Sequence, residues 1–283
     1  MLTINLFNGL VYGALLIIMC SGLALIYGLR RVVNFAHGSL YMLGAYIGYS
    51  VALRYNFWAA LVAAPAIMAL LGVLLDRYGF RLLQDRDPLT VVLVTFGLLL
   101  VIEDFVQTTW GKSNLSVEAP AVLATSIDFF GTPLPAYRVA VIGVGALVAL
   151  GLTAWLRFSK AGLFVRAAST DPTTTAMQGV NTDALSAGVV GLGTALAGLA
   201  GVVAAPFLSL SPSMSSDVII DSFVVVVVGG LGSLAGAFVA AMVLGMVQSL
   251  GAVYLPDLSA ILPFVIMVAV LIWRPAGFAG SRT

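Results

Sequence analysis

The sequence predicts an all-α, polytopic integral membrane protein. Hydrophobic residues make up 61% of the 283 residues and charged residues only 9%, and the mean hydropathy is +1.09. Soluble domains contain roughly 25% charged residues, so this chain could not cover a surface that faces water. The strands of a β-barrel alternate apolar and polar residues over roughly ten positions. The apolar blocks here are long and continuous, which favours helices.

These apolar blocks are the expected membrane helices. They fall at about 5–29, 39–53, 57–75, 89–109, 138–156, 185–210, 222–252 and 258–273. A helix needs roughly 20 residues to cross a bilayer, so the second block is short and the seventh is long. Glycines interrupt the seventh block at Gly229, Gly230, Gly232 and Gly236. They predict a broken helix, either two short passes or a re-entrant pair, and thus about 8–9 passes in one transmembrane domain, 1–283.

Lysine and arginine are unevenly distributed among the connections between blocks. The basic connections contain Arg30 and Arg31, then Arg77, Arg81 and Arg86, then Arg157, Lys160 and Arg166, and finally Arg274 and Arg282. The positive-inside rule therefore places the N-terminus outside and both the loop 157–184 and the C-terminus inside. An odd number of crossings follows, which requires the seventh block to count as two. The N-terminus lacks a basic region and a cleavage site, so we expect the first block to remain as a membrane span.

The loop 157–184 is too polar to cross the membrane and carries its own helix signals. Asp171 is an N-cap candidate, Pro172 suits the first helical position, and Gly179 with Asn181 can end a helix. This order predicts a short helix over 172–178 that lies on the membrane surface. The alternative is a plain basic connector.

A nucleotide site is not predicted, although "GGLGSLAGAF" at 229–238 looks like a phosphate-binding loop. A P-loop needs a lysine, and none follows to the end of the chain. The net charge of +1 gives no attraction to nucleic acid. His37 and Cys20 are the single histidine and cysteine. We therefore expect no metal site, no disulfide and no catalytic constellation, and hence neither a cofactor nor an enzyme.

Several polar residues allow two interpretations each. His37 is expected to be a structural residue at the inner interface, the alternative being a proton relay. Glu103 and Asp104 are functional candidates inside a membrane segment or solvated residues near its outer end. Asp217 and Asp221, before the valine run, could face a substrate or partner from outside. They could equally be helix caps, with Asp221 favoured by the helix dipole.

Two further patterns concern packing and a transport path. The stretches 34–46 and 229–238 share Gly-Ser-Leu followed by Gly-Ala, which is either a weak internal repeat or chance. A repeat would place a transport path between two broken helices. The candidate path residues are Asn34, His37, Gly38 and Ser39 with Gly229, Gly230, Gly232 and Ser233. Small residues at near-helical spacing over 188–205 predict close helix packing, within the chain or against another one.

Three stretches carry a resemblance to a known family: "GLRRVVNFAHGSLYMLGAY" at 28–46, "RAASTDPTTTAMQGVN" at 166–181 and "VVVVVGGLGSLAGAFVAAMVLG" at 224–245. The chain resembles the inner-membrane permeases of bacterial ABC importers for branched-chain amino acids, the H-type subunit in particular. The likeness covers nearly the whole chain and is specific to the permease family, not to a substrate, because related permeases transport amides, urea or aromatic acids.

The resemblance implies partners and a mechanism. Such a permease pairs with a second, M-type permease, two cytoplasmic P-loop ATPases bind beneath the pair, and a periplasmic binding protein delivers substrate. Transport proceeds by alternating access. The loop 166–181 is similar to the family's ATPase coupling loop, which implies ATPase contact over 168–178. The coupling residues are Arg166, Ala168, Ser169, Asp171, Pro172, Thr173, Met177, Gln178 and Gly179. Threonines stand at 173–175 where many relatives carry an acidic residue and alanine, which leaves any particular salt bridge in doubt.

The expected function is therefore that of a permease subunit in a bacterial inner-membrane importer of branched-chain or other apolar amino acids. The alternatives are an ABC permease for amides, urea or aromatic carboxylates, and a stand-alone secondary transporter. A secondary transporter needs ion-coupling residues deep in the membrane, and the sequence shows no paired acids or lysine at mid-span.

Overall fold

The computed structural model describes residues 2–32, 34–83, 86–129 and 132–279. Arg282 and residues 130–131 of the expected outer loop lie outside this part of the chain. The elements, with η for 3-10 helices, are α1 (Leu2–Arg30), α2 (His37–Arg54), α3 (Phe57–Tyr78), η1 (Phe80–Leu83), α4 (Pro88–Trp110), η2 (Ala121–Leu123), β1 (Ser126–Phe129), β2 (Thr132–Pro135), α5 (Ala136–Phe158), α6 (Lys160–Thr170), α7 (Pro172–Met177), α8 (Thr182–Ala204), α9 (Met214–Gly229), α10 (Leu234–Tyr254), η3 (Pro256–Leu258) and α11 (Leu262–Trp273).

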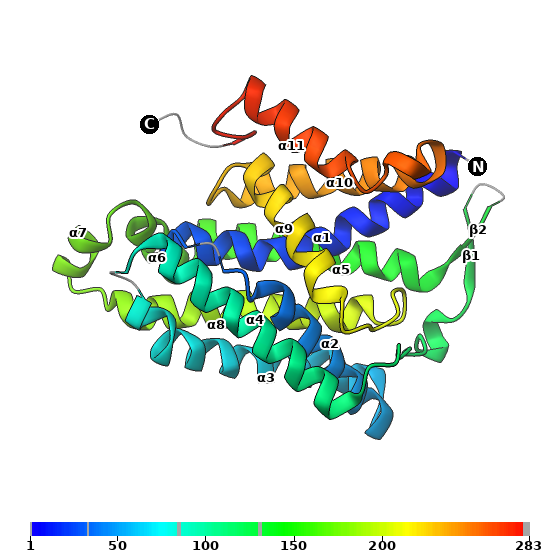
Figure 1. Cartoon of the computed structure of the whole chain (residues 1–283), viewed down its shortest axis with the longest axis horizontal. Coiled ribbons are helices and arrows are strands. Elements are labelled where there is room, and N and C mark those ends of the chain that lie inside the picture. The colour runs from blue at the N-terminus through cyan, green and yellow to red at the C-terminus, as the bar shows by residue number, and fades with distance from the viewer. Residues whose placement is uncertain (1, 33, 84–85, 130–131, 280–283) are drawn as a thin grey trace.

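Helix α1 is the centre of the bundle that these helices form (Figure 1). It packs against α5, α8, α9 and α10, and 89% of its apolar window is buried. The windows in α3, α4 and α5 are only 17–28% buried. The more exposed apolar surfaces of these outer helices suit contact with lipid, whereas α1 is surrounded by protein.

Six helical stretches of the described residues are long and apolar enough to cross a membrane. They are Leu2–Arg30, Phe57–Leu83, Pro88–Trp110, Ala136–Phe158, Thr182–Ala204 and Leu234–Tyr254. The shorter helices α2, α9 and α11 pack against them or against one another. The predicted class, a mainly α-helical polytopic membrane protein, is therefore confirmed.

The long seventh block is two helices, as its glycines predict. Helix α9 ends at Gly229 and α10 begins at Leu234. Gly230 and Gly232 take φ angles of 102° and 84°, a region that residues with a side chain rarely adopt. The Ser233 hydroxyl then caps α10 by accepting a hydrogen bond from the Gly236 amide at 3.1 Å. The chain turns between α9 and α10, and the two helices pack against each other.

A small β-hairpin interrupts the expected all-α chain. Strands β1 and β2 pair antiparallel in the loop between α4 and α5, with Ser126 opposite Pro135. In the same region, Leu115 and Leu210 form an isolated antiparallel β-bridge, which joins the α4–α5 and α8–α9 connections. Hydropathy blocks identify long helices only, so the sequence analysis missed a hairpin of this size.

Helix α8 crosses its neighbours at small residues, which confirms the packing predicted from 188–205. A Cβ atom added to Gly22 of α1 would lie 2.3 Å from the Gly193 carbonyl oxygen of α8. A Cβ atom on Gly44 of α2 would lie 2.4 Å from the Gly198 Cα. Because both obstacles are backbone atoms, the helices approach this closely only with glycine at these positions.

The substitution Gly22→Ala is therefore expected to lower the free energy of unfolding by about 1–3 kcal/mol, because the added methyl group forces α1 and α8 apart. Gly143→Ala in α5 is the matched control, since a Cβ atom there meets nothing within 4 Å. Thermal unfolding in detergent measures both. Equal midpoints for the two variants would contradict the packing argument.

Candidate functional site

The segment that was predicted to couple, 166–181, folds as a helix–corner–helix unit. Helix α6 ends at Thr170, Asp171 forms the corner, and α7 follows over Pro172–Met177. The Asp171 carboxylate accepts hydrogen bonds from the backbone amides of Thr173 and Thr174, both at 3.0 Å. This confirms the predicted N-cap and places Pro172 in the first turn of the helix.

The end of α7 also follows the prediction, with one change. Gly179 has a φ angle of 85° and lets the chain turn away after the helix. Asn181 does not end α7; its side-chain oxygen accepts a hydrogen bond from the Ala184 amide at 2.9 Å and caps α8 instead. The preceding helix α6 was not predicted, because the sequence analysis treated residues before Asp171 as loop.

Helix α7 projects from one end of the bundle (Figure 1). Pro172, Thr173 and Gln178 are exposed, and Met177 has 81% of its surface exposed. In α6, Arg166 is exposed, Ala168 is buried and Ser169 is partly buried. The predicted coupling residues thus form one protruding unit whose inner side, including Ala168, rests on the bundle.

The Asp171 cap remains formed at neutral pH. Hydrogen bonds from Thr174, through its hydroxyl and its backbone amide, hold the pKa of this carboxyl below its usual value, and the Thr173 amide adds to the effect. A carboxyl group with a lowered pKa stabilises the folded form above its ordinary pKa of about 3.9, and the stabilisation is lost as the pH falls through the lower value. The cap therefore does not respond to pH changes between 5 and 8.

Asp171→Ala is accordingly expected to fray α7, whereas Asp171→Ser keeps an N-cap and retains most of the helix. Hydrogen exchange over residues 172–178 measures the fraying directly. Equal exchange rates in the two variants would contradict the cap assignment.

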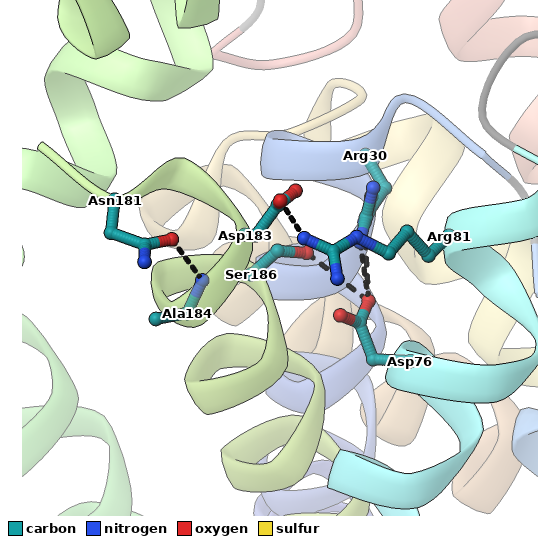
Figure 2. A network of polar contacts seen from close by, with 7 residues as sticks. All are labelled: Arg30, Asp76, Arg81, Asn181, Asp183, Ala184 and Ser186. Atoms are coloured by element: carbon teal, nitrogen blue, oxygen red, sulfur yellow. Dashed lines mark hydrogen bonds and ion pairs between the residues drawn. The ribbon is translucent and has the colours of Figure 1, made fainter.

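A buried ion pair and a serine hydroxyl join α1, α3 and α8 next to this segment (Figure 2). The Arg30 guanidinium at the end of α1 donates to Asp76 Oδ1 of α3 at 2.8 Å, and the Ser186 hydroxyl of α8 donates to the same oxygen at 3.1 Å. The side chains of Arg30 and Asp76 are only 8% and 2% exposed. An exposed second pair, Arg81 with Asp183, lies beside it. Asp76 was not predicted from the sequence. The available signal was a carboxylate next to Arg77 at the end of an apolar block.

A cavity of about 230 Å³ lies where this network meets the coupling unit. Its wall includes Arg30 and Arg31, the corner around Asp171, and Asp183 at the start of α8. The Arg31 guanidinium donates to the Ser169 carbonyl oxygen at 3.3 Å. The chain just after α1 is thus hydrogen-bonded directly to the end of α6.

The candidate path residues near α2 lie inside the bundle. Asn34, His37 and Ser39 have at most 1% of their surfaces exposed. The His37 ring is within 3.0 Å of the Met19 carbonyl oxygen, far from the inner end of α1 at Arg30. The expectation of an interfacial histidine is therefore wrong: residues after Arg31 turn back into the bundle, so α2 begins well below the surface.

The second set of path candidates lies at the other end of α9. Gly38 abuts Ser215 and Ile219 near the start of α9, whereas Gly229 ends this helix and Gly232 abuts Gly28 of α1. The two Gly-Ser-Leu motifs also differ in place, since Ser39 is in the first turn of α2 and Ser233 precedes α10. Helix α9 separates the two sets, so they do not form one cluster within this chain.

The structure also shows the contacts and the exposure of the acidic residues of α4 and α9. Glu103 accepts a hydrogen bond from the Ser215 hydroxyl, and Asp104 is exposed. Helix α9 begins at Met214, so Asp221 lies inside the helix and the interpretation of Asp221 as a cap is wrong. The Asp221 carboxylate instead accepts hydrogen bonds from Tyr12 and Gln248.

The bundle of long apolar helices defines a class of protein, the polytopic α-helical membrane proteins. Residues 5–271 match the family described as branched-chain amino acid transport system / permease component, and the chain belongs to this family.

Curated relatives match almost the whole chain. The high-affinity branched-chain amino acid transport system permease protein LivH of Escherichia coli K12 is 26% identical over 98% of this chain and 94% of its own length. BraD of Pseudomonas aeruginosa is 26% identical over 98% and 95%. LivM of Salmonella typhimurium is 26% identical over 92% of this chain and 67% of its own length. A solved structure of PsaBC from Streptococcus pneumoniae aligns with a TM-score of 0.49 at 14% identity over 93% and 90%.

Proposed function

We propose that this chain is the H-type permease subunit of an ABC importer that moves branched-chain or other apolar amino acids across the bacterial inner membrane. The observation that carries the proposal is α7, a capped and exposed helix at one end of a bundle whose sequence matches the permease family over 5–271. Its relatives LivH and BraD are named as permeases of branched-chain amino acid transport.

The proposed topology has nine crossings, made by the six long apolar helices together with α2, α9 and α11. The N-terminal end of α1 and helix α7 lie at opposite ends of the bundle (Figure 1). The Phe278 amide donates to the Val228 carbonyl oxygen at 2.9 Å, which holds the segment after α11 beside the α9–α10 turn. With α7 in the cytoplasm, the N-terminus is outside and the C-terminus inside.

The proposed partners are a second permease of the M type, two P-loop ATPases beneath the pair, and a periplasmic binding protein on the outer loops between α4 and α5 and between α8 and α9. Similarity to both LivH and LivM supports a pair of related permeases. ATP hydrolysis takes place on the ATPase chains.

Coupling in this proposal proceeds through the polar network below α7. An ATPase that moves α7 also moves α6, which Arg31 holds through the Ser169 carbonyl oxygen. The Arg30–Asp76–Ser186 cluster fixes the ends of α1, α3 and α8 to one another. These three helices therefore move as one body when the coupling unit moves, and alternating access follows from their rotation against the partner permease.

Purification of the tagged chain from native membranes in mild detergent, followed by mass spectrometry, tests the proposal. We expect a second permease and P-loop ATPases to co-purify, and the accompanying binding protein then identifies the substrate. Recovery of a folded chain without partners would overturn the proposal and favour a stand-alone secondary transporter. A binding protein that selects amides, urea or aromatic carboxylates would replace the amino acid substrate by one of these classes.

A further inference from the structure

A carboxylate inside the bundle is paired with no lysine or arginine among the residues that the structure describes. Asp221 of α9 accepts a hydrogen bond from the Tyr12 hydroxyl of α1 at 2.6 Å and one from Gln248 Nε2 of α10 at 2.8 Å. Tyr12 lies ten residues into α1, which begins at Leu2. This places the group about 15 Å from one end of a 29-residue helix about 43 Å long, inside a hydrocarbon layer about 30 Å thick.

The charge of this carboxylate is not balanced by any neighbouring helix. Helices α10 and α11, which pack against α9, contain no lysine or arginine. Arg30 of α1 and Arg54 of α2 lie in the last turns of their helices. Arg30 is 18 residues from Tyr12, or about 27 Å along the helix. A charged group inside the membrane is costly unless a partner of opposite charge meets it, so a cation from outside this chain would be stabilised beside Asp221.

The geometry leaves room for such a cation. Each carboxylate oxygen accepts one hydrogen bond, and a carboxylate offers about four acceptor positions. Asp221 keeps 8% of its surface exposed, and both Tyr12 and Gln248 are only partly buried, so the group lies at the wall of the bundle. Asp217, one turn before it on the same face of α9, is exposed.

The two hydrogen bonds also fix the orientation of the carboxylate. Tyr12 and Gln248 come from α1 and α10, which pack closely through Gly13 and Gly245. Ile220, the residue before Asp221 on α9, is 43% exposed and adds aliphatic surface near this part of the helix. A fixed carboxylate beside exposed aliphatic surface matches a molecule that has both an ammonium group and an aliphatic side chain.

We propose that Asp221, held by Tyr12 and Gln248, binds the α-ammonium group of an amino acid substrate as it passes between the two permeases. This inference rests on the proposed function and deepens it. Asp217 attracts the ammonium group nearer the outer end of α9, and Asp221 receives it inside the membrane. Aromatic carboxylates, amides and urea have no ammonium group to pair with Asp221, so this carboxylate selects amino acids among the substrates of related permeases.

Leucine uptake by the complete importer in proteoliposomes, at saturating loaded binding protein, tests the site. Asp221→Asn keeps the shape and removes the charge, whereas Asp221→Glu keeps the charge and changes the shape. We expect Asp221→Asn to lower maximal uptake about tenfold or more, as loss of a charged hydrogen bond implies. Asp221→Glu should retain more activity than Asp221→Asn. The concentration of binding protein that gives half-maximal uptake should not change, and the exposed acid variant Asp257→Asn serves as the control.

Each other outcome has a definite meaning. If Asp221→Asn transports as well as the wild type, or better than Asp221→Glu, the role of Asp221 is structural and the inference is overturned. If Asp221→Asn loses the partner permease on purification, the cation belongs to that subunit and the inference is overturned as well. A wild-type complex that assembles but transports no amino acid would overturn the proposed substrate and this inference together.

Discussion

Replacement of Asp76 by alanine is expected to lower the free energy of unfolding by about 3–5 kcal/mol, the largest effect on stability that we anticipate from a single side chain. Asp76 is 2% exposed, and its carboxylate pairs with the equally enclosed Arg30 guanidinium at 2.8 Å. Removal of the carboxylate leaves a buried positive charge and deprives the Ser186 hydroxyl of its acceptor. Unfolding of the purified protein in mixed micelles measures the loss.

A double variant separates charge from packing at this position. In Arg30→Met/Asp76→Leu both charges are replaced by apolar side chains of similar length, so no charge stays buried. We expect it to recover most of the stability that Asp76→Ala loses. A double variant as unstable as Asp76→Ala would show that the ion pair is not the source of the effect. Transport by a stable double variant would also reveal whether coupling requires the ion pair or only the contact among α1, α3 and α8.

The second large effect is expected at Met177, where substitution by glutamate should reduce recovery of the ATPases about tenfold or more. Met177 is 81% exposed on α7, and a flexible apolar side chain at the tip of a docking helix suits a pocket on a partner. A carboxylate introduced there would be buried without a partner at the interface. Quantitative mass spectrometry of complexes purified from membranes measures the recovery.

Val122→Glu is the matched control for this experiment. Val122 is 75% exposed in η2, in the loop between α4 and α5 at the other end of these helices. The same change from an apolar to an acidic side chain should leave ATPase recovery unaltered there. Equal recovery from both variants would remove Met177 from the ATPase interface.

Local sequence signals were sufficient to predict helix α7 and the break in the seventh apolar block. Asp171 caps α7 through amides two and three residues away, and Gly230 and Gly232 take their turn conformations within one loop. Such features depend on neighbours in the sequence, so composition and spacing predict them. The match of residues 5–271 to one family shows the class, whereas the role of 166–181 as a coupling loop stays a proposal.

The interior polar groups could not be found in this way. Asp221 meets Tyr12 across 209 residues, and Asp76 meets Arg30 and Ser186 across 46 and 110. Hydropathy locates the helices but not the faces on which they meet. It also does not give the depth at which a helix begins. For this reason His37 was expected at the interface although it lies beside Met19, and no acid was expected at mid-span.

Helix α2 packs against helices that are synthesised after it, and this affects how the protein is assembled in the membrane. This helix packs chiefly against α8 and α3, and α8 begins at Thr182, long after α2 has left the ribosome. Its first turn contains His37, which a lipid environment would not satisfy. We therefore expect the nascent α2 to remain bound to the insertion machinery, or to a membrane chaperone, until α8 is synthesised. Chains truncated before α8 should be degraded in the cell even though they contain four long apolar helices.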